Sequence, residues 1–128
     1  MPESPLHGDL VASLMHCIVD NLTVVTHAVG YPSLPDPYKI GRHEPDLIAN
    51  ANGVLIIGEA KTGEDLDEER SREQIEDFCN AIGPNGEKAA FWLCVPDSWA
   101  DAARAEIDAS GQGHYRVEVL PVKGLATS

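Results

Sequence analysis

Positively charged residues are scarce in this sequence, and their scarcity limits what the chain can bind. Nine lysines and arginines stand against 21 aspartates and glutamates, which gives a net charge of −12. Proteins that bind nucleic acid without sequence preference present a basic face, because neutralised phosphates release counterions. This composition argues against such a face. Much of the acid excess lies in Glu64–Asp77, and its simplest interpretation is a solvated helix face.

Long apolar runs and paired metal-binding motifs are also missing. Apolar runs such as Val54–Ile57 are far too short to span a bilayer, and Met1 is followed by proline and glutamate rather than a basic segment. We therefore expect a cytoplasmic protein that does not contact membranes. The three cysteines lack CxxC spacing and the five histidines lack HExxH spacing, which disfavours a disulfide framework or a dedicated zinc site.

What is present fits one compact α/β domain over residues 1–128. Apolar residues at helical spacing predict helices, and short β-branched or alternating runs predict strands. The expected helices are Leu6–Leu22, a helix capped by Asp65 with an apolar stripe of Ile75, Phe78, Cys79 and Ile82, and a helix from Asp97 or Ser98 to Ser110. The expected strands are Thr23–Val29, Asp46–Asn50, Val54–Ala60, Ala89–Val95 and His114–Val122. The order α-β-β-β-α-β-α-β predicts a mixed central sheet flanked by helices.

The segment PDLIANANGVLIIGEAK, from Pro45 to Lys61, is the most informative stretch. Asn52-Gly53 is a strong signal for a two-residue hairpin turn, and with it at the centre Asp46 lies opposite Glu59. Cross-strand partners project from the same face with Cβ atoms roughly 4.5–5.5 Å apart. Lys61 lies two residues beyond Glu59 and so shares that face. The hairpin therefore predicts two carboxylates and one ammonium at a single point.

This grouping suggests a metal-assisted reaction. Two carboxylates so close repel each other, and one pKa rises unless a cation lies between them. Mg²⁺ prefers a few carboxylates and keeps its other positions for water and phosphate oxygens. Lys61 beside such an ion could orient an attacking water or offset charge on a phosphate, which points to phosphodiester hydrolysis. The alternative is a simple ion pair of Lys61 with Asp46 or Glu59.

At these residues the sequence resembles the PD-(D/E)xK nuclease superfamily, whose fold occurs in restriction endonucleases and archaeal Holliday junction resolvases. Pro45-Asp46 and Glu59-Ala60-Lys61 carry the resemblance, with spacing nearest to the resolvase-like members. It implies a restriction-endonuclease-like fold with Mg²⁺ or Mn²⁺ as cofactor. Asp46, Glu59 and the Ala60 carbonyl would be metal ligands, and Lys61 the catalytic lysine. Gln74 would be the site glutamine of the following helix.

The resemblance also implies further contacts and partners. Resolvase-like members carry a glutamate in the first helix, which this chain lacks, so Asp9 and His16 are the candidate substitutes. Arg70 could contact a phosphate. Arg42 and His43 could grip the DNA backbone, or they could be ordinary loop charges. The acidity of the chain favours a homodimer, a protein partner or a branched, structured DNA that positions the scissile bond.

Two other functions stay open from the sequence. A catalytically silent nuclease-fold module could bind a basic protein through its acidic surface. Action on RNA or on a small phosphorylated molecule is a weaker alternative, because aromatic residues make up only 5% of the chain and are not interleaved with basic ones.

Overall fold

The strands form one mixed sheet with a simple order. The computed structural model describes residues 5–19, 23–110 and 116–123. Within them, five strands lie in the order β1-β2-β3-β4-β5. Strands β1 and β2 are antiparallel, as are β2 and β3, whereas β3, β4 and β5 run parallel to one another. The strands are β1 (Thr23–Ala28), β2 (Leu47–Ala51), β3 (Val54–Ala60), β4 (Ala90–Pro96) and β5 (Val117–Val122).

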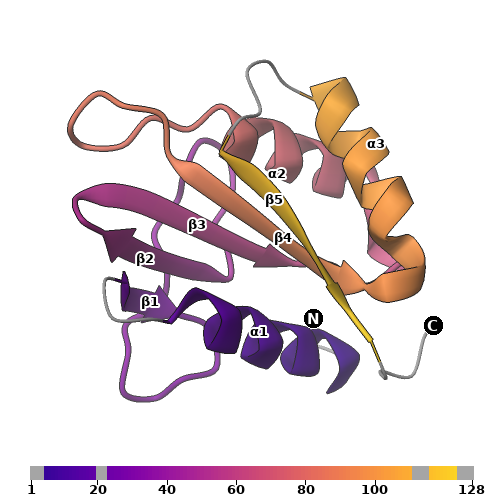
Figure 1. The fold of residues 1–128 in the computed structure, drawn as a ribbon, viewed down its shortest axis with the longest axis horizontal. Helices are drawn as coiled ribbons and strands as arrows, with labels where there is room; N and C mark the ends of the chain where they lie inside the picture. The colour runs from indigo at the N-terminus through magenta and orange to yellow at the C-terminus, as the bar shows by residue number, and fades with distance from the viewer. Residues whose placement is uncertain (1–4, 20–22, 111–115, 124–128) are drawn as a thin grey trace.

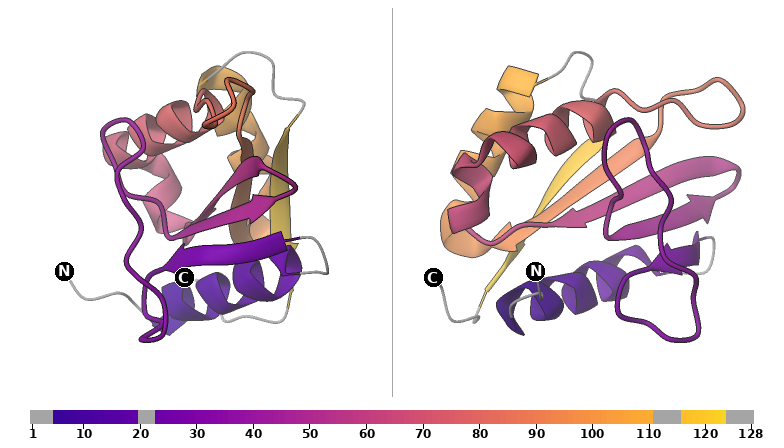
Figure 2. Two further views of the ribbon diagram at one scale, coloured as in Figure 1. Left: turned by 90° about the vertical axis from the view of Figure 1, so that its left-hand side faces the viewer. Right: turned by 180° about the vertical axis from the view of Figure 1, so that it is seen from behind.

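Helices cover both faces of this sheet. Helix α1 (Pro5–Ile18) lies on one face, and α2 (Glu69–Cys79) and α3 (Ala100–Ser110) lie on the other, as Figures 1 and 2 show. Parallel neighbours need a crossover connection, and α2 and α3 supply the two that join β3 to β4 and β4 to β5. The predicted α/β sandwich and its order of elements are therefore confirmed.

Each face of the sheet has its own apolar core. Successive strand residues point to opposite faces, so Ile56 packs under α1 while Ile57 packs under α2. Strands β3 and β4 contribute to both cores, as their continuous apolar runs predict. The α1 core includes Leu10, Leu14, Leu47, Ala49, Ala60 and Cys94. The α2 and α3 core includes Leu66, Ile75, Phe78, Phe91, Leu93, Ala103 and Ile107.

The hairpin of β2 and β3 has the predicted register. Leu47 pairs with Gly58 and Ile48 with Ile57. Asp46 lies just before β2, where its N–H bonds to the Gly58 carbonyl at 3.1 Å and to Glu59 Oε1 at 3.0 Å, so it lies beside Glu59. Asn52 and Gly53 both have positive φ values, 52° and 84°, as a type I′ turn requires. The Asn50 side chain accepts a hydrogen bond from the Gly53 N–H at 2.9 Å and stabilises the turn.

The start and end of α2 differ from the prediction. A 3₁₀ turn, Glu64–Asp67, precedes the helix, and Glu68 is extended (φ −78°, ψ 143°) where the prediction placed the first helical turn. The Asp65 carboxylate accepts from the Thr62 hydroxyl at 3.0 Å and so does not cap the helix. Leu66, within the tight turn, is buried in the core. At the other end, α2 stops at Cys79, and Ile82 is 61% exposed instead of facing the core.

The remaining predictions concern the ends of elements. Helix α1 ends at Ile18, and Leu22 and His114 lie outside the described residues. A 3₁₀ turn, Asp97–Trp99, precedes α3, which reaches Ser110 as predicted. Cys79 and Cys94 are buried and Cys17 is exposed. None of the helices in the described part of the chain has the length and apolar character that crossing a membrane requires.

Candidate functional site

Asp46 and Glu59 meet where β2 begins and β3 ends. The N–H of Asp46 donates to Glu59 Oε1 at 3.0 Å, and the N–H of Ala60 donates to Asp46 Oδ2 at 2.9 Å. Both acids are almost fully buried, with exposed fractions of 8% and 3%. A strand residue presents its N–H and its C=O to the same neighbouring strand. The carbonyl of Ala60 therefore faces the side on which Asp46 lies.

Lys61 and Gln74 complete the cluster from the α2 side. Lys61 Nζ lies 3.3 Å from Glu59 Oε2, and it donates a hydrogen bond to Gln74 Oε1. Gln74 reaches the site from α2 and is 3% exposed. The ammonium is therefore held between one strand and one helix. We call Asp46, Glu59, Lys61 and Gln74 the acid–lysine cluster.

Electrostatics favour a proton on one of the two acids when no cation is bound. Burial raises the pKa of Glu59 well above its ordinary value, and the neighbouring charge of Asp46 raises it further. Lys61 acts in the opposite direction but does not cancel these two effects. The site thus holds more carboxylate than its single lysine neutralises.

The donor set fits a hard divalent cation held by two carboxylates. Across the residues that the structure describes, no group of three His, Cys, Asp or Glu side chains is arranged to hold a metal ion. The side chains of Asp46 and Glu59 contact each other closely enough to raise the pKa of Glu59, so one cation could contact both carboxylates. Mg²⁺ and Mn²⁺ take carboxylate and carbonyl oxygens and keep several waters, which suits Asp46, Glu59 and the Ala60 carbonyl.

The raised pKa of Glu59 predicts how stability depends on pH in a chelator. The folded-state pKa exceeds the unfolded-state value, so this stabilisation is complete below the unfolded-state pKa of about 4.3 and is lost as pH rises through the folded-state pKa. Each unit of difference is worth about 1.4 kcal/mol. Urea unfolding between pH 5 and 9 should show this decline in the wild type, and Glu59→Gln, which mimics the protonated acid, should lack it. Equal slopes in both proteins would contradict the prediction.

The first helix contributes a residue that the sequence analysis missed. His7 Nε2 lies 3.1 Å from Asp46 Oδ2, with both side chains 11% exposed. The predicted substitutes, Asp9 and His16, are both exposed on other sides of α1. At about 100° per residue, they lie roughly opposite to His7. The signal was available, because His7 continues the buried stripe of Leu14 and its neighbours.

The predicted phosphate-binding residues lie apart from the cluster. Arg42 Nη2 lies 2.8 Å from Glu76 Oε1 and 2.9 Å from Asp77 Oδ1. The hydrogen bond to Asp77 raises the pKa of Arg42 above its ordinary value. His43 Nε2 lies 3.0 Å from Glu73 Oε1. Both residues thus fasten the loop before β2 to α2. A role for them in substrate binding stays a prediction.

Arg70 differs from these two residues. It is exposed in the first turn of α2, and within the described residues it forms no ion pair. Its side chain is therefore available to a ligand, and its predicted contact with a phosphate stays a prediction.

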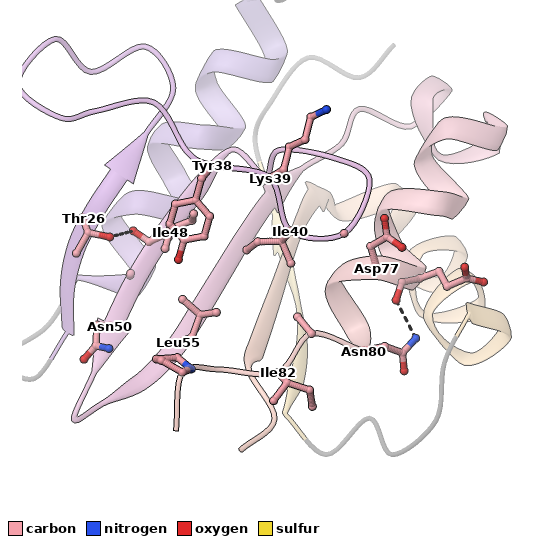
Figure 3. Close-up of a pocket in the computed structure, with 15 residues that line it drawn as sticks. Thr26, Tyr38, Lys39, Ile40, Ile48, Asn50, Leu55, Asp77, Asn80 and Ile82 are labelled. Atoms are coloured by element: carbon pink, nitrogen blue, oxygen red, sulfur yellow. Dashed lines mark hydrogen bonds between the residues drawn. The ribbon is translucent and has the colours of Figure 1, made fainter. Parts of the chain in front are cut away.

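A cavity of about 890 Å³ lies between the loop before β2, the sheet and the end of α2. Figure 3 shows Tyr38 and Ile40, from the loop before β2, together with Ile48 and Leu55 from the sheet. The opposite wall of the cavity is formed by the end of α2 and the segment that follows it, including Asn80 and Ile82. Asp46 and Glu59 do not line it, so the cavity and the acid pair are separate features.

Comparisons with known proteins add no family at this point. No family model, no curated protein and no solved structure matches the chain.

Proposed function

We propose that this chain is a divalent-metal-dependent endonuclease that hydrolyses phosphodiester bonds in DNA, with a restriction-endonuclease-like fold and Mg²⁺ or Mn²⁺ as cofactor. The observation that carries the proposal is the burial of Asp46, Glu59 and Lys61 at one point between two strands. A simple ion pair needs only one acid and one lysine. Burying a second carboxylate costs free energy unless a further cation compensates its charge.

In the proposed mechanism each residue of the site has one task. Asp46, Glu59 and the Ala60 carbonyl would hold the cation, whose chemistry when bound would be to polarise a phosphate oxygen and lower the pKa of a bound water. Lys61 orients the attacking water and offsets negative charge on the phosphate as the bond breaks. Gln74 accepts a hydrogen bond from Lys61 and fixes the direction of the ammonium.

The charge of the chain bears on the substrate and the assembly. A net charge of −12 opposes long-range attraction to DNA, so binding must depend on local contacts. We propose branched or structured DNA as substrate, because its shape can position the scissile bond. We also propose a homodimer, which would present two sites to two strands.

The proposal is tested by metal binding and cleavage with one matched pair of variants. Wild-type protein should bind Mn²⁺ in calorimetry and nick supercoiled plasmid or branched DNA with Mg²⁺ or Mn²⁺. Asp46→Asn removes a charged ligand and should lower cleavage at least about 100-fold. Asp9→Asn, at an exposed position of α1, is the control and should behave as wild type. Absence of both Mn²⁺ heat and nicking in the wild type would refute the proposal.

A second candidate function is a catalytically silent module that binds a basic protein partner. The pairing of Arg42 with α2 favours it, because this cation is already engaged by Glu76 and Asp77. The same calorimetric titration separates the two functions. A silent module should show no heat with millimolar Mn²⁺, whereas the nuclease should bind it.

A further inference from the structure

We infer that His7 is a positioning residue for Asp46, through which α1 orients that carboxylate for the cation; the inference rests on the proposed function. The observation is the contact of 3.1 Å between His7 Nε2 and Asp46 Oδ2. The two residues are 39 positions apart, so only the packing of α1 on the sheet brings them together.

Two groups hold the same oxygen of Asp46. Oδ2 receives the Ala60 N–H at 2.9 Å and faces His7 Nε2 at 3.1 Å. A carboxylate oxygen accommodates about two donors, so Oδ2 is filled. The Asp46 side chain also contacts that of Glu59, the other proposed ligand. His7 and the Ala60 N–H therefore orient the Asp46 carboxylate beside Glu59, as neighbouring groups commonly do for metal-binding carboxylates.

This geometry implies a defined tautomer of His7. For His7 to donate to the Asp46 carboxylate, the ring must carry a proton on Nε2, because an unprotonated Nε2 would place a lone pair against the oxygen. The His7 side chain is 11% exposed on the inner side of α1.

The packing of α1 on the sheet determines how close His7 lies to Asp46. A Cβ on Gly58 would lie 2.8 Å from Leu14 Cδ2, so the missing side chain lets the helix approach β3 closely. Leu14 lies seven residues, or about two turns, after His7 and on the same side of the helix. Close approach at Gly58 therefore brings the start of α1 to Asp46.

The test compares a variant that keeps the donor with one that removes it. His7→Gln retains a side-chain N–H, whereas His7→Leu fills a similar volume without one. In calorimetry on the full chain, His7→Leu should bind Mn²⁺ about 10–100-fold more weakly than wild type. His7→Gln should stay within a few-fold of wild type. His16→Gln, at an exposed position of the same helix, is the matched control and should leave the Mn²⁺ Kd unchanged.

The outcomes separate this inference from the proposed function. Tight Mn²⁺ binding by wild type and His7→Leu alike would overturn the role of His7 and leave the nuclease proposal standing. No Mn²⁺ binding by wild type would overturn the nuclease proposal and the role of His7 with it. If circular dichroism shows that His7→Leu does not fold, His7→Gln decides, and a loss of tenfold or more in that folded variant would overturn the role of the donated hydrogen bond.

Discussion

Replacing Lys61 with methionine is expected to abolish DNA cleavage while leaving Mn²⁺ binding intact. Lys61 Nζ is held 3.3 Å from Glu59 Oε2 and by Gln74, so its charge is directed at the proposed reaction centre. Removing one preorganised electrostatic contact of this kind costs about 10²–10³-fold in rate. The metal ligands are untouched, the repulsion between Lys61 and the bound cation is removed, and Mn²⁺ displaces the proton that Glu59 carries when no cation is bound. Single-turnover cleavage and calorimetry together measure this separation.

The same substitution should change stability little. Methionine fills the space of the lysine stem and no longer buries an ammonium, which costs free energy to desolvate. Glu59 loses its cationic partner, but its pKa is already raised, so it can take up a proton instead of staying charged. Lys123→Met, at an exposed position after β5, is the control for loss of one positive charge. Equal loss of cleavage in both variants would point to overall charge and contradict a local role.

The hairpin was predictable because its determinants are local. Asn52-Gly53 fixes the turn, the turn fixes the register, and the register brings Asp46 beside Glu59. The period of two along a strand then puts Lys61 with them. The meeting of these side chains could therefore be predicted from the sequence alone.

The contact of His7 with Asp46 could be predicted only in part from the sequence. The buried stripe of α1 includes His7, so the helical period favours it over Asp9 and His16. Which end of the helix reaches the site depends on how α1 crosses the sheet, and that is a tertiary property. Asp9 and His16, the predicted substitutes for the missing glutamate, are exposed on the side of α1 opposite to His7.

The start of α2 and the setting of Arg42 were not predicted for two different reasons. Asp65 is followed by Glu68 in the pattern of a capping box, but its carboxylate bonds to Thr62, three residues before it, and Leu66 is buried in the core. Arg42 contacts acids more than 30 residues away on α2. Local patterns do not describe the Arg42 contacts, because these depend on which segments pack together.

Substituting Gly63 with alanine is expected to destabilise the protein strongly, although its backbone is ordinary. Gly63 has φ −59° and ψ −39°, which any residue adopts, so glycine is not needed for conformation. A Cβ there would lie 1.9 Å from Trp99 Cε2 and 2.1 Å from Trp99 Nε1. The indole is rigid and is packed against the α2 and α3 core, so it cannot swing aside as a flexible chain would. We expect a loss of about 1–3 kcal/mol in the free energy of unfolding, measured in urea.

A double variant and one matched glycine identify the cause of that loss. Gly63→Ala combined with Trp99→Leu should recover part of the stability, because the clash disappears when the ring is gone, so the two effects will not add. Gly8→Ala is the control, since nothing lies within 4 Å of a Cβ there and alanine favours the interior of α1. Gly63 follows Lys61 by two residues, so a displaced Gly63 segment should also reduce cleavage. Full stability of Gly63→Ala would show that Trp99 moves freely, and the packing that holds the strand end beside Lys61 would then lie elsewhere.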